Sequence, residues 1–236
     1  VRAASNRIAE SLIRAGLAAR ECVTVLPVFT DIERAIAATP DPAALERFHG
    51  HSFKIVAAGR FVEKEKNFLL LIDMMLQLVQ RYPDALLVIA GEGPDKERYL
   101  NRIRAYGLKK NVILEKWVSN LPSFIAAFDA LCISSNYEGW GVVALEAMAV
   151  GVPVVMTDVG LAGELIVHGE NGLVVPVGNV QAYGTAVASL AKDPVMRRRI
   201  GENGRARIMA YTLLLKREEY LRRLRQSFAH CINIIL

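Results

Sequence analysis

The chain has 236 residues, of which 53% are hydrophobic and 22% are charged, and its formal net charge is +5 at pH 7. This composition is typical of a globular protein with an ample core, and it excludes an intrinsically disordered chain. No uninterrupted apolar stretch reaches the roughly 18 residues that span a bilayer. The sequence also lacks the basic and then apolar opening of a signal peptide.

The cysteines Cys22, Cys132 and Cys231 are far apart and form no C-x-x-C pair. Their spacing argues against a disulfide framework and against a zinc site, and it suits a reducing cytoplasm. The sequence opens with Val1 rather than Met and continues directly into a helical pattern. We therefore expect the natural N-terminus to lie further upstream.

Apolar periodicity predicts the elements along the chain. Residues 1–16 are expected to be the end of a helix, 23–28 a short strand, and 31–50 a linker with one short helix around 43–48. From residue 53 onward, strands and helices alternate. Strands are expected at 53–59, 85–90, 112–114, 130–134, 153–157 and 173–175. Helices are expected at 67–81, 95–106, 122–128 and 142–150, with further helices at the C-terminus.

Alternation of helices with continuously apolar strands predicts a parallel sheet that is covered on both faces, and so an α/β fold. Ligands of such sheets bind outside the carboxyl ends of the strands. This rule selects the loops at 59–66, 91–94, 117–120, 134–141 and 158–164. Polar and glycine-rich segments fall in several of them, which is the first indication of function.

The loop at 134–141 leads from a strand into an apolar helix. Gly139 and Gly141 would let a ligand approach the backbone closely. The amides of Gly141, Val142 and Val143 would form the first helical turn, and such a turn binds anions because its donors and the helix dipole point the same way. An ordinary turn is the alternative interpretation.

Two carboxylates flank this turn. Glu138 lies at the mouth of the loop, and Glu146 lies about one turn into the helix. Carboxylates are poor ligands for phosphate but good acceptors for the hydroxyls of a sugar or a ribose. The alternative for Glu146 is an ordinary position on the surface of the helix.

The loop after the strand at 53–59 is basic. Arg60 follows the strand directly, and Lys66 precedes the next helix. Arginine as a bidentate fork and lysine as a point charge suit one diphosphate. Lys64 competes with Lys66 for this role, and a solvated charged loop is the alternative. The turn at 91–94, G-E-G-P, is expected to be structural first and a ligand wall second.

Several catalytic motifs are absent. No strand is followed by G-x-G-x-x-G, and the sequence contains neither a P-loop nor a G-x-S-x-G elbow. The histidines show no metal-binding spacing; they are His49, His51, His168 and His230.

Basic residues cluster between Arg197 and Arg225 and are opposed only by Glu202, Glu218 and Glu219. A solvated face of terminal helices is one interpretation. A surface that meets anionic lipid headgroups or an acidic partner is the other. Nucleic acid ranks lower, because no aromatic residues interleave with the arginines as a base-stacking groove needs.

Taken together, the segments resemble the C-terminal domain of the retaining GT-B fold glycosyltransferases of glycosyltransferase family 4. The most specific element is E-x(7)-E, from Glu138 to Glu146, within N-Y-E-G-W-G-V-V-A-L-E-A-M-A-V-G-V-P-V-V. Supporting segments occur in the family's order: V-A-A-G-R-F-V-E-K-E-K-N-F, G-E-G-P, V-G-L-A-G-E ending at Glu164, and H-G-E-N-G-L-V-V-P-V-G-N. The resemblance covers roughly residues 23–208 and implies a Rossmann-like doubly wound parallel sheet with C-terminal helices, one half of a GT-B fold.

The resemblance implies that Arg60 and Lys66 neutralise the donor diphosphate, which becomes the leaving group. Glu138 would hold hydroxyls of the donor sugar, and Gly59 would border the donor. The remaining donor-binding residues would fall into three groups. The sugar pocket would be lined by Gly139, Trp140 and Gly141. The phosphates would meet the amides of Val142 and Val143. The ribose hydroxyls would be bound by Glu146. The nucleobase would be bordered by Trp117, Val118 and Ser119.

This chain departs from the family pattern at several positions. Trp140 stands where Phe is more frequent, and Leu161 replaces a usual second glycine. The lysine Lys66 follows Arg60 by six residues, where five is common, which leaves the choice between Lys64 and Lys66 open.

The resemblance further implies the donor half of an enzyme that transfers a sugar from a UDP, GDP or ADP sugar, with retention, to a saccharide or lipid-linked acceptor. Neither a metal nor a cofactor would be needed. Residues 1–50 would be a remnant of the N-terminal domain and the linker, 51–210 the nucleotide-sugar-binding domain, and 211–236 the C-terminal helix. Without the N-terminal acceptor domain, the chain would bind donor but transfer slowly or not at all, and its exposed apolar surface would favour self-association.

Three other functions remain open. One is a nucleotide-binding domain of the same fold without transfer activity. Another is a different GT-B enzyme, such as a sugar-nucleotide epimerase or a phosphorylase. The third is a module that docks on the inner membrane face through an apolar stripe of the basic terminal helix, made by Tyr220, Leu221, Leu224 and Phe228.

Overall fold

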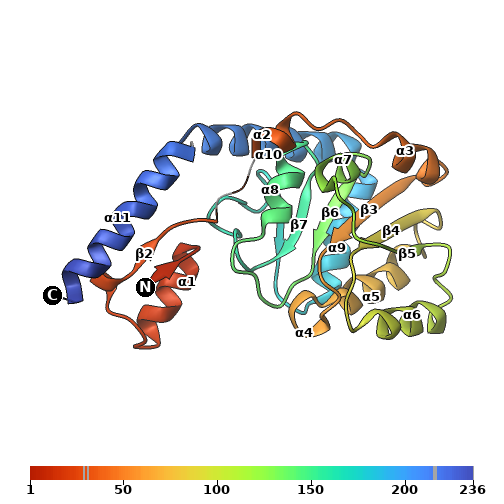
Figure 1. The fold of residues 1–236 in the computed structure, drawn as a ribbon. Coiled ribbons are helices and arrows are strands. Elements are labelled where there is room, and N and C mark those ends of the chain that lie inside the picture. The colour runs from red at the N-terminus through yellow and green to blue at the C-terminus, as the bar shows by residue number, and fades with distance from the viewer. Residues whose placement is uncertain (29, 31, 215–216, 236) are drawn as a thin grey trace.

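The computed structural model describes residues 1–28, 30, 32–214 and 217–235 (Figure 1). A six-stranded parallel sheet has the strand order β5-β4-β3-β6-β7-β8. Its strands are β3 (Phe53–Ala58), β4 (Ala85–Ala90), β5 (Val112–Glu115), β6 (Ala130–Ile133), β7 (Val154–Thr157) and β8 (Leu173–Val175). Counted along the chain, this is the 3-2-1-4-5-6 order of a doubly wound Rossmann-type sheet. The predicted α/β fold is confirmed.

Helices cover both faces of the sheet, because neighbouring residues of each strand enter opposite cores. Val56 and Leu131 belong to one core, and Ile55 and Cys132 belong to the other. The first core also contains residues of α3 (Pro42–Phe48), α7 (Leu121–Ile125) and α8 (Val142–Ala149). The second contains residues of α5 (Phe68–Leu78), α6 (Lys96–Ala105) and α9 (Val180–Lys192). Burial on both faces explains why the strands read as continuous apolar runs.

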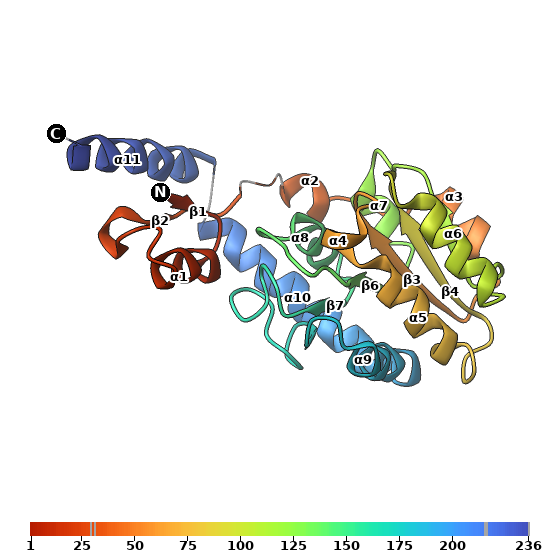
Figure 2. The same cartoon turned by 90° about the horizontal axis from the view of Figure 1, so that it is seen from below.

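The N-terminal segment forms a small unit beside the sheet. It contains β1 (Arg2–Ala3), α1 (Asn6–Arg14), η1 (Arg20–Cys22) and β2 (Thr24–Val25), and β1 pairs with β2 in parallel. The long α10 (Pro194–Leu214) crosses the sheet domain, and α11 (Arg217–Ile235) returns to lie against this unit (Figures 1 and 2). The Arg2 guanidinium carbon lies 4.4 Å from the centroid of the Phe228 ring.

Several expected elements are corrected. The segment expected as the end of a helix begins with β1, because Arg2 and Ala3 pair with a strand more than twenty positions away. Two short helices were not expected: α2 (Ile32–Ile36) lies within the linker, and α4 (Glu63–Lys66) lies within the basic loop. Tyr211 lies inside α10, so the last helix begins at Arg217 rather than near residue 211.

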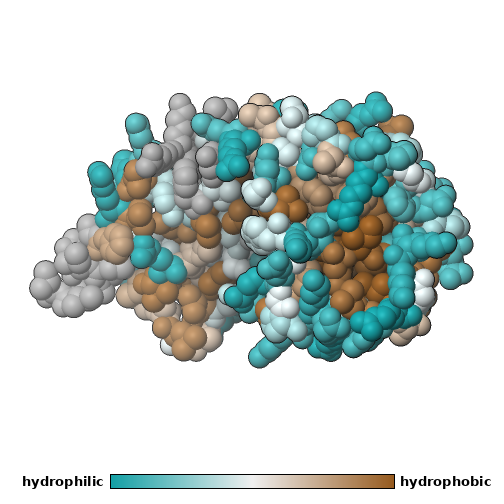
Figure 3. All heavy atoms as spheres, turned by 45° about the vertical axis from the view of Figure 1, so that its right-hand side comes forward, coloured by the Kyte–Doolittle hydropathy of each residue, from teal (hydrophilic) through white to brown (hydrophobic). Residues whose placement is uncertain are grey.

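Apolar side chains also gather on the surface around the N-terminal unit, at the lower left of Figure 3. In the N-terminal segment, Val1 and Leu17 have 51% and 72% of their surface exposed. Across the described ranges, no helix combines the length and the apolar character that crossing a bilayer requires.

Candidate functional site

Two adjoining cavities lie at the carboxyl ends of the strands, where the strand order reverses between β3 and β6. The first, which we call the Glu138 cavity, has a volume of about 300 Å³. The second, the Glu146 cavity, has a volume of about 440 Å³ and is lined by residues of α2, α7 and α8. Val142 and Val143, the first residues of α8, line both cavities. An elongated ligand can therefore pass from one cavity to the other along the N-terminus of α8.

Most of the candidate residues lie in these cavities. The Glu138 cavity is lined by Lys66, Glu138, Trp140 and Gly141. The Glu146 cavity is lined by Trp117, Val118, Ser119 and Glu146. Residues that the sequence places in three separate loops and one helix are thus brought to one edge of the sheet.

Three candidate residues do not line either cavity. The side chain of Arg60 is 71% exposed, and its guanidinium lies 3.5 Å from the carboxylate of Glu65. Gly139 faces open space. Gly59 contributes indirectly, since a Cβ at this position would lie 3.3 Å from Cε of Lys66. The absence of a side chain at residue 59 thus leaves room for the lysine.

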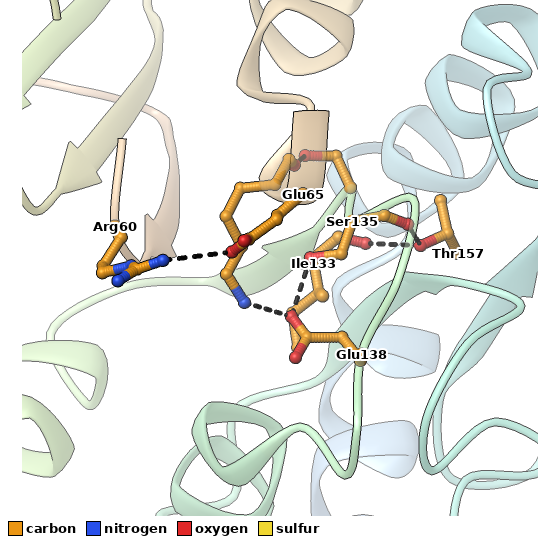
Figure 4. A network of polar contacts seen from close by, with 8 residues as sticks. Arg60, Glu65, Ile133, Ser135, Glu138 and Thr157 are labelled. Carbon is orange, nitrogen blue, oxygen red and sulfur yellow. Dashed lines mark hydrogen bonds and ion pairs between the residues drawn. The ribbon is translucent and has the colours of Figure 1, made fainter. Parts of the chain in front are cut away.

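Lys66 and Glu138 meet within the Glu138 cavity. The ammonium of Lys66 lies 2.5 Å from Oε1 of Glu138, and the hydroxyl of Ser135 donates to the same oxygen at 2.7 Å. The hydroxyl of Thr157 donates in turn to the backbone carbonyl of Ser135 at 2.6 Å (Figure 4). Lys64 is exposed and does not line the cavity, so the geometry favours Lys66 as the residue that faces a ligand there.

Asn136 joins the basic loop to the loop after β6, a role that the sequence did not suggest. Its amide N–H donates to the carbonyl of Glu65 at 2.8 Å, and its side chain donates to the carbonyl of Lys64 at 3.2 Å. The side chain of Asn67, a residue with a left-handed φ of 48°, donates to Oδ1 of Asn136 at 3.0 Å. These bonds hold Lys66 beside Glu138.

The N-terminus of α8 opens toward both cavities. Gly141 precedes the helix with a φ of 95°, and no side chain caps it. Gly160, from the loop after β7, packs against this region: a Cβ there would lie 2.7 Å from the carbonyl oxygen of Trp140 and 3.0 Å from Cβ of Glu138. The turn at 91–94 packs on the basic loop instead, where the N–H of Phe61 donates to the carbonyl of Glu92 at 2.8 Å.

Glu146 is half-buried in its cavity. Burial raises the pKa of this carboxyl, and the positive charge of Arg34 partly offsets the rise. Arg34 comes from α2 and lines the cavity with Ala35 of the same helix and with Thr30, which precedes it. Sequence reasoning missed Arg34. The apolar spacing of Ile32 and Ala35, three residues apart, was a weak signal for this helix.

Cys132 borders the Glu138 cavity at the end of β6. Burial raises the pKa of its thiol to about 12. The sulfur is therefore protonated and is a poor nucleophile. In the described ranges, His, Cys, Asp and Glu nowhere form a group of three or more that could hold a metal ion.

The N-terminal unit is tied to the loop after β7. The guanidinium of Arg7 donates to the carbonyl and to Oδ1 of Asp158, both at 2.6 Å, and to the carbonyl of Ala162 at 3.0 Å. Glu164 accepts from the backbone N–H of Arg7 and from the side chain of Asn6, both at 3.0 Å. In this structure Glu164 therefore connects the N-terminal unit to the loop after β7.

Comparisons of sequence find relatives among sugar-transferring enzymes. The chain is 30% identical over 182 residues to the lipopolysaccharide core biosynthesis glycosyltransferase LpsE of Rhizobium meliloti, which covers 77% of this chain and 51% of the relative. It is 34% identical over 151 residues to an alpha-D-kanosaminyltransferase of Streptomyces kanamyceticus. This match covers 63% of this chain and 39% of the relative. The chain thus spans about half the length, or less, of these curated relatives.

Comparisons of structure find the same fold. The Anabaena protein HepE, solved in complex with UDP, superposes with a TM-score of 0.83 at 22% identity, over 97% of this chain and 63% of that one. The C-terminal domain of LpcC, a group 1 family glycosyl transferase from Francisella tularensis, has a TM-score of 0.68 at 27% identity. The match covers 77% of this chain and 97% of that domain. The family model for glycosyl transferases group 1 matches residues 46–207, more than half of the sequence. The chain belongs to the family of glycosyl transferases group 1.

Proposed function

We propose that this chain is the donor-binding half of a retaining glycosyltransferase of family 4, which transfers a sugar from a nucleotide diphosphate sugar to a saccharide or lipid-linked acceptor. The observation that carries the proposal is the pair of cavities that meet at the N-terminus of α8. In this placement the diphosphate lies against the amides of Val142 and Val143. The sugar then lies in the Glu138 cavity and the nucleoside in the Glu146 cavity.

The leaving diphosphate gains negative charge as its bond to the sugar breaks. Lys66 and the N-terminus of α8 stabilise this charge, and one well-placed donor contributes about 3 kcal/mol. Arg60 joins them by turning away from Glu65, because an exposed ion pair of this kind is worth only about 0–1 kcal/mol. The acceptor attacks from the face that the diphosphate leaves, and the diphosphate takes its proton, which retains the configuration without a metal.

The other end of the donor lies in the Glu146 cavity. The carboxylate of Glu146 accepts hydrogen bonds from the ribose hydroxyls, as its position one turn into α8 permits. Trp117, Val118 and Ser119 border the base. Trp117 is 64% exposed, so it presents its ring at the rim of the cavity.

The relatives support a nucleotide sugar as donor. HepE is described in complexes with UDP and with UDP-glucose, and LpsE is named as a glycosyltransferase. Because the curated relatives extend well beyond the matched segment, we place the acceptor site on an N-terminal domain. Residues 1–50 are the remnant of that domain and the linker, and α2 and α3 of the linker pack into the core of the donor domain. Residues 51–210 form the donor domain, and the C-terminal helix packs back on the remnant.

A thermal-shift titration with UDP, GDP and ADP tests the proposal, with Glu146→Ala as control. A ligand at a hundred times its dissociation constant stabilises the fold by about 2.7 kcal/mol. We expect one diphosphate to raise the melting temperature of the wild-type chain but not of the variant. If none of the three changes it, the donor site is misplaced.

A further inference from the structure

Ser135 holds an unusual position beside the Glu138 cavity. It is the second residue after β6, and only 1% of its surface is exposed. Its backbone carbonyl accepts the hydrogen bond from Thr157, which is fully buried at the end of β7. Ser135 is therefore fixed from behind by the neighbouring strand, and its hydroxyl is directed toward Glu138 (Figure 4).

The carboxylate of Glu138 receives both of its described hydrogen bonds at one oxygen. Oε1 accepts from Ser135 at 2.7 Å and from the Lys66 ammonium at 2.5 Å. Both ionic side chains are shielded, with 14% of the Glu138 side chain and 22% of the Lys66 side chain exposed. Among the described residues, Oε2 accepts no hydrogen bond, so it is the oxygen of Glu138 that can accept one from a ligand in the cavity.

The two partners of Oε1 differ in what else attracts them. Lys66 is a flexible cation, and a diphosphate at the N-terminus of α8 competes with Glu138 for it. The Ser135 hydroxyl is neutral and belongs to a residue that is only 1% exposed, although it borders the cavity, so a diphosphate attracts it far less than it attracts Lys66. When a donor draws Lys66 toward its phosphates, Ser135 is the partner that keeps the carboxylate in place.

We propose that Ser135 is a positioning residue for Glu138: its hydroxyl holds the carboxylate where Oε2 accepts a hydroxyl of the donor sugar. This inference rests on the proposed function, because it assumes that the sugar occupies the Glu138 cavity. It predicts that Ser135 acts on the sugar part of the donor and leaves the nucleotide part unaffected.

Isothermal titration of the full chain separates the two parts. The probes are three pairs: UDP with UDP-glucose, GDP with GDP-mannose, and ADP with ADP-glucose. For the pair that the wild-type chain binds, the dissociation constant of the diphosphate divided by that of the sugar nucleotide gives the gain from the sugar. Ser135→Ala is expected to reduce this gain about tenfold, the effect of losing one hydrogen bond to a charged group. The affinity for the diphosphate alone should stay within about twofold of the wild-type value, as expected for a substitution that does not touch the diphosphate.

Two variants make the test specific. Ser135→Thr retains the hydroxyl and should restore the gain. Ser134→Ala is the matched control: Ser134 is equally buried, but its hydroxyl donates at 2.8 Å to the backbone carbonyl of Lys66 and not to Glu138. Its affinities for the diphosphate and for the sugar nucleotide should change in parallel.

A double-mutant cycle completes the experiment. If Ser135 acts through Glu138, adding Ser135→Ala to Glu138→Gln should cause no further loss of the gain. Unchanged gain in Ser135→Ala overturns the inference, and so does an equal fall in both affinities, which marks a merely structural residue. A wild-type chain that binds the diphosphate without any gain from the sugar also overturns it. A wild-type chain that binds none of the probes instead refutes the proposed function.

Discussion

The ammonium of Lys66 and the carboxylate of Glu138 lie 2.5 Å apart, although 72 positions separate them in the sequence. Lys66 ends α4, and Glu138 lies in the loop after β6. Their loops are joined by the hydrogen bonds of Asn136. In the absence of ligand, the cavity therefore neutralises its own charges, and a donor must exchange this internal ion pair for bonds to phosphate and sugar.

Lys66→Ala should lower the affinity for the nucleoside diphosphate about 10- to 100-fold, because a hydrogen bond between the ammonium and phosphate is charge-assisted. It should also lower the melting temperature, since it leaves Glu138 without its cation in a shielded cavity. Lys64→Ala is the matched control. This variant removes the same charge from Lys64, an exposed side chain two residues before Lys66. Titration calorimetry should find its affinity for the diphosphate close to that of the wild type. Equal losses in both variants would contradict the assignment of Lys66.

Arg60→Ala should lower the affinity for the diphosphate although Arg60 faces Glu65 in this structure. An exposed ion pair is weak, so phosphate can recruit the guanidinium at little cost. Glu65→Ala releases Arg60 from its partner and should leave the affinity equal or higher. Binding that is unchanged in Arg60→Ala would remove this residue from the donor site.

Glu146→Gln should weaken nucleotide binding while it stabilises the free protein at neutral pH. Burial raises the pKa of Glu146, so the folded chain holds this proton more tightly than the unfolded chain does. The cost of ionising the carboxyl is absent below its ordinary pKa of 4.5 and grows as the pH rises through that value toward the raised pKa. Melting curves should show a gain in Tm for the variant at pH 7.5 that disappears near pH 4. A gain of the same size at both pH values would refute this explanation.

Gly160→Ala should destabilise the site. A Cβ at residue 160 would lie 2.7 Å from a carbonyl oxygen, and its φ of 53° is left-handed. Backbone strain at residue 160 and displacement of the neighbouring carbonyl should together lower the free energy of unfolding by about 1–3 kcal/mol, as urea unfolding would measure. The affinity for the donor should fall as well. Gly139→Ala adds the same methyl group where nothing lies within 4 Å, so its stability should change by less than about 0.5 kcal/mol.

Arg7→Ala should loosen the loop after β7. The guanidinium makes three hydrogen bonds to Asp158 and Ala162, but its side chain is 39% exposed, so we expect a loss of about 1 kcal/mol. Hydrogen exchange of amides 158–166 should become faster. Arg14→Ala should not change it, because the described hydrogen bond of Arg14 runs from its Nε to the carbonyl of Glu10 in its own helix. Unchanged exchange in Arg7→Ala would show that other contacts hold the loop.

Local pattern was sufficient for the sheet and for the loops at the carboxyl ends of its strands. The strands at 85–90 and 173–175 were predicted with their observed bounds, since strands that are buried on both faces read as continuous apolar runs, and only Val174 is partly exposed among these residues. The rule that ligands bind at the carboxyl ends of parallel strands then selected the loops that border both cavities. Glu138 and Glu146 were predicted in the same way, because they lie in one of these loops and in the helix that follows it.

Local pattern failed where the interaction is distant or the element is short. The helices α2 and α4 have five and four residues, too few to display a helical period. For this reason Arg34 was missed.

The sequence by itself determined which segments form the sheet and which loops reach its ligand-binding edge, because burial and periodicity are properties of neighbouring residues. Only the tertiary structure decided that Lys66 rather than Lys64 faces Glu138, and that Asn136 joins the two loops. These contacts join residues far apart in the sequence. Their geometry depends on how the strands are ordered in the sheet, which no local pattern records.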